Sequence, residues 1–178
     1  MATVLITGAN RGIGLEYCRQ LQARGDAVVA VCREPSQKLR DLGVRIEAGV
    51  DVTSGASIAD LLGRLAGLPI DVLIQNAGIL ERTSLEDLDP ESLRRQFEVN
   101  AIAPLNLSRA LLGQLAPGAK LVLMTSRMGS IADNSSGAPT ATACRRWPSA
   151  WPAHPWRSTS RRAASPWRSS TPAWCAAP

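Results

Sequence analysis

The amino-acid sequence predicts an α/β protein in which helices cover both faces of a doubly wound parallel sheet. Two observations support this fold class. Short, almost wholly apolar runs alternate with segments of helical periodicity, and a glycine-rich turn joins the first run to the first helix. Strands that are apolar on both faces need helices above and below them. Because βαβ crossovers are right-handed, we expect the spatial strand order 3-2-1-4-5.

The predicted strands are short runs rich in apolar and β-branched residues. The first, "TVLIT", ends at Gly8, and the second reads "AVVAVC". In chain order the five predicted strands span Thr3–Thr7, 27–32, 44–50, Ile70–Gln75 and 120–125.

The first two helical segments lie between the first three strands. A helix is predicted from residue 12, with Gly25 as its stop, and a short helical turn at 37–42. The apolar residues that share one face of the first helix are Ile13, Tyr17 and Leu21.

Two further helices follow the third and fourth strands. Either Ser54 or Ser57 is the expected cap of the third helix, whose apolar residues at helical spacing are Ile58, Leu61, Leu62 and Leu65. The last helix is expected over 91–115, with a possible kink at Pro104. Its expected apolar stripe consists of Leu93, Phe97, Ala101 and Leu105.

The glycine-rich turn has the pattern T-G-x-x-x-G-x-G, formed by Gly8, Gly12 and Gly14. Glycines there let backbone N–H groups approach a pyrophosphate, and the N-terminus of the following helix favours its negative charge. An ordinary glycine-rich turn is the alternative. The strand before it, the helix after it and the later strands favour dinucleotide binding.

Four later motifs extend this pattern: "VDVT" at 50–53, "QNAG" at 75–78, "FEVNAIAP" at 97–104 and "MTSRMGS" at 124–130. With the glycine spacing, they resemble the short-chain dehydrogenase/reductase family over about residues 3–137. Within it, "SRMGSIADNSSG" is most similar to the C-factor-like carbonyl reductases. The resemblance implies a Rossmann-like domain at 1–138 and hydride transfer between a nicotinamide cofactor and a small-molecule carbonyl or alcohol. Family members are typically homo-oligomeric, which is doubtful for this chain.

The resemblance also implies site residues. Asn100 and Ser126 match the positions of the family's catalytic asparagine and serine. The expected cofactor-binding residues are Gly8, Asn10, Arg11, Gly12, Ile13, Gly14, Arg33, Asp51, Val52, Asn76, Ala77 and Gly78. Asp51 and Val52 would hold the adenine, and 76–78 would lie beside the nicotinamide-side ribose.

NADP is the expected cofactor, and NAD is less favoured. A carboxylate at the end of the second strand would bind the ribose hydroxyl of NAD and repel a 2′-phosphate. Here Cys32 is followed by Arg33, and Arg11 adds a second cation. Two guanidinium groups suit a phosphate, whereas exposed arginines without a ligand are the alternative.

Charge is divided unevenly along the chain. Residues 1–138 carry a net charge of −1, whereas 139–178 carry six arginines and no acidic residue. The basic balance therefore belongs to the last segment and does not indicate a nucleic-acid-binding surface.

The four cysteines have no ligand-like spacing, so we expect no metal site. No apolar run is long enough for a membrane span, and we expect a cytoplasmic protein.

The family's proton donor is a tyrosine with a lysine four residues later, on the same helix face. The only tyrosine here is Tyr17, in the first predicted helix, and the only lysines are Lys38 and Lys120. None of these residues can form that pair. The expected Tyr-x-x-x-Lys segment is therefore missing.

A shifted reading frame explains the missing pair. Reading each codon from the last base of its predecessor allows the segment from Trp156 to encode Leu-Ala-Val-Asp-Leu, and the segment from Arg161 to encode a strand and a His-Pro-Gly turn. The same frame allows a tyrosine across Ala141 and Thr142 and a lysine four positions on. We therefore interpret 139–178, which has seven prolines and no apolar periodicity, as an irregular, out-of-frame tail.

The competing interpretation is a non-catalytic nucleotide-binding or interaction protein with a natural basic tail. The coding DNA distinguishes the two. We predict that one base restored near the Gly137 codon opens a long frame containing Tyr-x-x-x-Lys. Sequencing the gene checks this, and a restored frame that soon meets a stop codon would support the natural tail.

Overall fold

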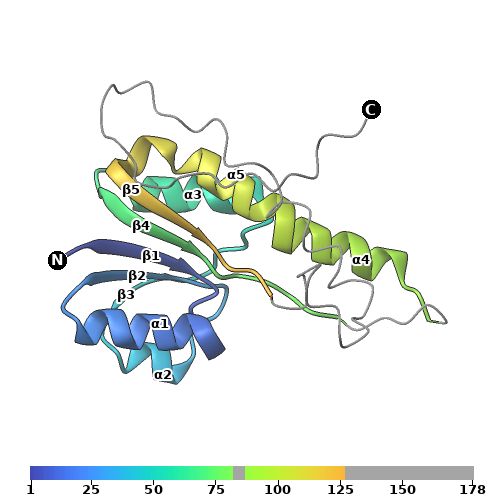
Figure 1. The fold of residues 1–178 in the computed structure, drawn as a ribbon, viewed down its shortest axis with the longest axis horizontal. Coiled ribbons are helices and arrows are strands. Elements are labelled where there is room, and N and C mark those ends of the chain that lie inside the picture. The colour runs from blue at the N-terminus through green and yellow to red at the C-terminus, as the bar shows by residue number, and fades with distance from the viewer. Residues whose placement is uncertain (82–86, 127–178) are drawn as a thin grey trace, which may run out of the picture.

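The structure is a computed structural model that describes residues 1–81 and 87–126. Figure 1 shows a parallel sheet between two layers of helices. The predictions for residues 127–178, including the irregular course of 139–178, lie outside the described residues.

Within the described residues the sheet has five strands, and all of its strand pairs are parallel. The strands are β1 (Thr3–Thr7), β2 (Ala27–Val31), β3 (Arg45–Glu47), β4 (Ile70–Gln75) and β5 (Leu115–Leu123). Their order is β3-β2-β1-β4-β5, which confirms the predicted topology. The predicted third strand, 44–50, was too long, because the chain leaves the sheet after Glu47.

Helices connect these strands and cover both faces of the sheet. They are α1 (Gly12–Ala23), α2 (Gln37–Arg40), α3 (Gly55–Arg64), α4 (Pro90–Phe97), the π-helix η1 (Glu98–Ile102), α5 (Ala103–Ala110) and the 3₁₀-helix η2 (Leu112–Gln114). In Figure 1, α1 and α2 lie on one face, and α3 and α5 lie on the other.

Alternate side chains of β1 enter two separate cores, because successive residues of a strand point to opposite faces. Val4 and Ile6 pack in one cluster with Cys18 of α1. Leu5 packs in the other with Leu61 of α3. The strands β1 and β2 are therefore buried on both faces, as their composition predicts, whereas most residues of β5 are exposed.

The predicted helix signals are also present. Gly25 follows α1 with a φ of 87°, so it ends the helix in the left-handed region that favours glycine. At α3 the structure decides between the two candidate caps. The Ser54 hydroxyl accepts a hydrogen bond from the Ser57 N–H at 3.3 Å, so Ser54 is the cap. The Ser57 hydroxyl instead accepts the Asp51 N–H at 3.0 Å.

The predicted boundary between the last helix and the last strand was wrong. The helix expected over 91–115 ends at Ala110, and β5 begins at Leu115 rather than at residue 120. Leu115 pairs with Ile70 of β4, and a register shift follows, in a stretch where Gly118 has a φ of 83°. The run "LLGQL" keeps helical spacing, but this pairing with β4 overrides it.

The irregularity expected at Pro104 is a π-helical stretch, Glu98–Ile102, just before it. Proline has no N–H to donate to the carbonyl of Asn100, four residues earlier, and its ring crowds that carbonyl. A wider turn relieves this contact, and such π-helical turns inside α-helices are frequent at functional sites. Asn100 lies in the middle of this stretch.

The predicted apolar faces were partly wrong. Ile13 is 62% exposed, and Phe97 and Leu105 are 42% and 46% exposed, although the prediction placed the latter two in one stripe with the buried Ala101. The buried residues of α4 are the polar Ser92 and Gln96. The stripe is wrong already in α4, where the buried residues lie one position before Leu93 and Phe97, and the π-helix then changes the number of residues per turn before Leu105.

Candidate functional site

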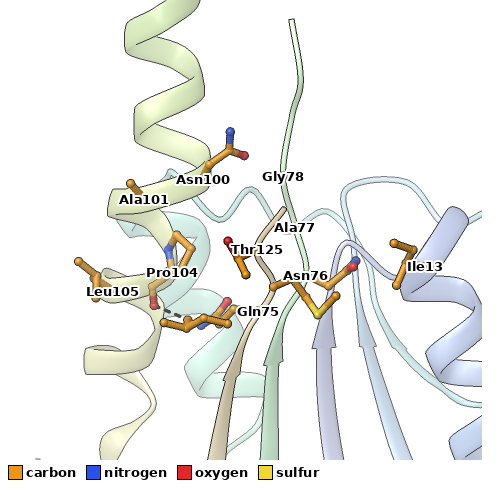
Figure 2. Close-up of a pocket in the computed structure, with 12 residues that line it drawn as sticks. Ile13, Gln75, Asn76, Ala77, Gly78, Asn100, Ala101, Pro104, Leu105 and Thr125 are labelled. Atoms are coloured by element: carbon orange, nitrogen blue, oxygen red, sulfur yellow. Dashed lines mark hydrogen bonds between the residues drawn. The ribbon is translucent and has the colours of Figure 1, made fainter. Parts of the chain in front are cut away.

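The candidate site lies at the carboxyl ends of β1, β4 and β5. A cavity of about 210 Å³ opens there, beside the helix that contains Asn100 (Figure 2). Its lining residues are Ile13, Gln75, Asn76, Ala77, Gly78, Asn100, Ala101, Pro104, Leu105, Leu123, Met124 and Thr125. In doubly wound sheets ligands bind where the strand order reverses, which here is between β1 and β4.

The glycine-rich turn after β1 is shaped by close backbone contacts. Gly8 and Gly12 have φ values of 66° and 55°, in the left-handed region. A Cβ on Gly14 would lie 2.3 Å from the Gly8 carbonyl oxygen, and a Cβ on Gly8 would lie 2.8 Å from the Cα of Ala77. Only hydrogen atoms fit at these two positions, so α1 and the turn after β4 both approach the glycine turn closely.

The N-terminus of α1 faces this turn. Arg11 is its N-cap residue and has extended backbone, and its side chain makes no capping hydrogen bond. The first N–H groups of an uncapped helix can bind an anion. The turn and helix therefore fit the pyrophosphate site that the sequence predicts.

Hydrogen bonds fasten the turn after β4 to the end of β1. The buried Thr7 hydroxyl accepts the N–H groups of Asn76 and Ala77 at 3.1 and 3.0 Å. In return, the Asn76 amide donates to the carbonyls of Thr7 and Gly8 at 3.0 and 3.2 Å. These four bonds fix the two turns relative to each other, so the cavity wall and the glycine turn form one structure.

A second contact joins the glycine turn to the segment after β2. The Ser36 hydroxyl donates to the carbonyl of Asn10 at 2.7 Å. It thereby brings the segment that carries Arg33 beside the one that carries Arg11, and both arginines are exposed. The sequence analysis missed Ser36, because a hydroxyl that bridges two distant turns has no sequence periodicity.

Asp51, one of the two expected adenine-site residues, stabilises its own turn. Its carboxylate accepts the N–H and the hydroxyl of Thr53 at 2.9 and 2.7 Å. These two bonds lower the pKa of Asp51, with a smaller contribution from the nearby Arg33 guanidinium. Asp51 is therefore anionic at neutral pH. Val52 is half-buried and packs against the core.

Asn100 lines the cavity, and Ser126 lies in the segment that follows β5. The Asn100 amide accepts the N–H of Ile79 and donates to the carbonyl of the same residue, both at 2.9 Å. Its side chain thus holds backbone rather than pointing freely into the cavity. Ser126 is half-buried and directly follows Thr125, which lines the cavity.

Gln75 is a cavity residue that the sequence analysis did not predict. It is 4% exposed, and its amide donates to the Pro104 carbonyl at 3.2 Å (Figure 2). The same amide donates to the Ser108 hydroxyl at 3.3 Å. It therefore connects β4 to α5 behind the cavity. A glutamine that ends an apolar strand could have indicated this, since a buried amide needs hydrogen-bond partners.

Residues 1–81 and 87–126 contain no group of three or more acidic, histidine or cysteine side chains that could hold a metal ion. Among the same residues, no helix is long and apolar enough to cross a membrane.

The strand order, the glycine turn and the cavity at the reversal point define a Rossmann-like α/β protein. Residues 2–142 match the family model described as short chain dehydrogenase, and the chain belongs to this family. It is 40% identical over 139 residues to 1-hydroxy-2-glutathionyl-2-methyl-3-butene dehydrogenase from Rhodococcus sp. (strain AD45), covering 77% of this chain and 62% of that protein. The chain thus spans less than two thirds of that relative's length.

Two other similarities bear on the subgroup. The chain is 43% identical over 72 residues to the C-signal protein of Myxococcus xanthus, covering 39% of this chain and 43% of that protein. A carbonyl reductase from Pseudomonas aeruginosa PAO1, solved in complex with NADP, superimposes with a TM-score of 0.74 at 35% identity. That match covers 82% of this chain and 70% of the reductase.

We predict that Gly14→Ala destabilises the chain by about 1–3 kcal/mol, because the new methyl group would meet the Gly8 carbonyl and the Asn76 amide, which cannot both move away. Urea unfolding followed by circular dichroism measures this. Gly63→Ala is the matched control: it lies in α3 with no atom within 4 Å of its Cβ and should stabilise the chain by about 0.5–1 kcal/mol. A Gly14→Ala chain as stable as the unaltered one would contradict the close packing.

Proposed function

We propose that this chain is an NADP(H)-binding member of its family, descended from carbonyl reductases, that binds the cofactor but has lost turnover. The observation that carries this proposal is the close fit of Gly8 and Gly14 against the turn after β4, beside the uncapped end of α1. At Gly8 and Gly14 a Cβ would collide with neighbouring protein atoms, whereas at Gly12 it would meet no atom within 4 Å, so the turn stays open to a pyrophosphate. The residues therefore fit a dinucleotide.

Preference for NADP(H) is supported by the charges beside the ribose site. Arg11 and Arg33 are exposed on segments that the Ser36–Asn10 hydrogen bond holds together. Guanidinium groups bind phosphate bidentately. The NADP complex of the Pseudomonas aeruginosa carbonyl reductase agrees with this preference.

The roles of the remaining site residues follow from their positions. Bound NADPH would supply the hydride for a carbonyl substrate. Ser126 would hydrogen-bond the substrate oxygen, and Asn100 would hold the cavity wall through Ile79. Asp51 would face the adenine, with its anionic side chain oriented by Thr53.

In its described part, this chain lacks a residue that is placed to donate a proton to the substrate. The hydroxyl of Tyr17, the only tyrosine in the sequence, donates to the Met124 sulfur at 3.8 Å, and Tyr17 does not line the cavity. Lys38 lies in α2 and Lys120 in β5. We therefore propose that 1–138 is the cofactor-binding domain, that 139–178 is translated out of frame, and that the latter replaces the segment carrying the tyrosine and lysine.

We expect the full chain to bind NADPH at least tenfold more tightly than NADH, because charge-assisted hydrogen bonds to the 2′-phosphate are each worth about 1.5–3 kcal/mol. Arg33→Asp should reverse this preference, since a carboxylate favours the free ribose hydroxyl. Titration by cofactor fluorescence measures both. Arg109→Asp, the same charge change at the end of α5, should leave the preference unaltered. Tighter binding of NADH by the unaltered chain would refute the assignment.

We expect no measurable carbonyl reduction by the chain as written, because loss of a positioned acid commonly costs about 10²–10⁴ in rate. The comparison is with the product of a gene repaired by one base near the Gly137 codon, assayed with NADPH and a panel of small ketones and aldehydes. Equal turnover by the two proteins would show that the missing segment is not needed. Activity only after repair would support both the descent and the shifted frame.

A further inference from the structure

The cavity-lining turn 76–78 continues into a stretch, residues 79–81, that two side-chain amides hold in place. At Ile79 the Asn100 amide makes two bonds with the backbone, as described above. At Glu81 the amide of Gln96 does the same: it accepts the N–H at 3.1 Å and donates to the carbonyl at 3.0 Å. Each side-chain amide thus supplies one acceptor and one donor to the backbone of one residue, as a residue of a neighbouring strand would.

The spacings of the helix and of this stretch agree. Gln96 and Asn100 are four residues apart, which corresponds to about 6 Å along a helix. Ile79 and Glu81 are two residues apart, which corresponds to about 6.6 Å of extended chain. Asn100 contacts Ile79, whereas Gln96 contacts Glu81, so the helix and the stretch run in opposite directions. We call this arrangement the amide ladder, made of Gln96, Asn100, and the backbone of Ile79 and Glu81.

Burial makes the Gln96 contact more than incidental. Gln96 is 3% exposed although it is polar, and its amide also donates to the buried Ser92 hydroxyl at 3.2 Å. Its acceptor and its donors are therefore used, as buried amides require. On the outer side, the Arg95 guanidinium pairs with the Glu81 carboxylate at 2.8 Å and lowers its pKa. That pair is exposed, so it adds little to the ladder.

The amide ladder also bears directly on the turn that lines the cavity. A Cβ placed on Gly78 would lie 3.0 Å from the Asn100 carboxamide oxygen. The turn is therefore held between two constraints: the Thr7 and Asn76 hydrogen bonds at its start and the ladder at its end. If the Gln96 contact is lost, Glu81 is released and the Asn100 contact alone fixes residues 79–81.

We propose that Gln96 is a positioning residue for the nicotinamide half of NADP(H), acting through the amide ladder on the backbone of 76–79. This role rests on the proposed function, because it assumes that the turn 76–78 lies beside the nicotinamide ribose. Gln96 itself does not line the cavity. Its loss should therefore weaken contacts with one half of the cofactor and leave the adenine half, held near Arg33 and Asp51, unchanged.

The test compares two ligands on the full chain: NADPH, and adenosine 2′,5′-bisphosphate, which contains only the adenine half. Gln96→Leu should raise the Kd of NADPH roughly tenfold, because it removes two backbone hydrogen bonds, and should change the Kd of the bisphosphate less than twofold. Gln96→Glu, which keeps the shape but sets a carboxylate against the Glu81 carbonyl, should behave like Gln96→Leu and serves if the leucine variant does not fold.

The matched control is Gln114→Leu. Gln114 also ties helix to backbone, through a bond to the Leu62 carbonyl at 3.1 Å, but it lies in η2, away from the cavity-lining residues. It should change neither Kd. Hydrogen exchange read by mass spectrometry should show faster exchange at 79–81 in both Gln96 variants and not in the control.

The outcomes separate this role from the function on which it rests. An equal loss of both ligands in the Gln96 variants would indicate general destabilisation and overturn the proposal, as would unchanged NADPH binding. If the unaltered chain binds neither ligand, the NADP(H) function fails and this role fails with it. Faster exchange at 79–81 would then still establish the ladder as a purely structural feature.

Discussion

The rest of the site depends on the close approach between the ends of β1 and β4, where hydrogen atoms stand in place of side chains. The Gly8 carbonyl lies against Gly14 of α1 on one side, and Gly8 lies against Ala77 on the other. Because these contacts bring three backbone segments together, the Thr7 hydroxyl can accept two N–H groups of the next turn. The glycine turn, the helix N-terminus and the cavity wall are consequences of one tight contact.

At the end of β4 and beyond it, side-chain amides supply the hydrogen-bond partners that neighbouring strands supply within the sheet. Gln75 ties the strand to α5, and Asn100 and Gln96 continue along the chain that follows. Backbone groups that leave a sheet still need partners when they are buried. A helix can supply them only through side chains long enough to reach out, which is why its inner face here carries amides instead of apolar residues. The polar face of α4 is thus a consequence of what it packs against.

The sequence was sufficient for the strand order, the glycine turn and the helix stop at Gly25, because these follow from the order of the elements and from local patterns; at α3 it left Ser54 and Ser57 as alternative caps. It was insufficient where contacts between distant segments determine the structure. Phe97 and Leu105 were assigned to the buried side, although α4 buries its polar residues and the π-helix changes the helical period before Leu105. Gln75 and Gln96 are of a residue type that is mostly exposed, and only the tertiary contacts show why they are buried. The early start of β5 depends on pairing with β4, which no local pattern contains.

Under the proposed function, cofactor binding and proton transfer belong to different parts of the chain. The groups that would hold the nucleotide lie between the glycine turn and Gly78, with Asn100 and the amide ladder behind them, on a sheet whose two faces each carry a buried apolar core. Beside them, β5 is an edge strand of the described sheet, and its apolar residues 121–124 are 36–48% exposed. An exposed apolar edge of this kind is a surface on which a further strand can pair. Under the proposed function, cofactor binding relies on described residues, whereas turnover also needs a Tyr-x-x-x-Lys pair that the described residues do not contain.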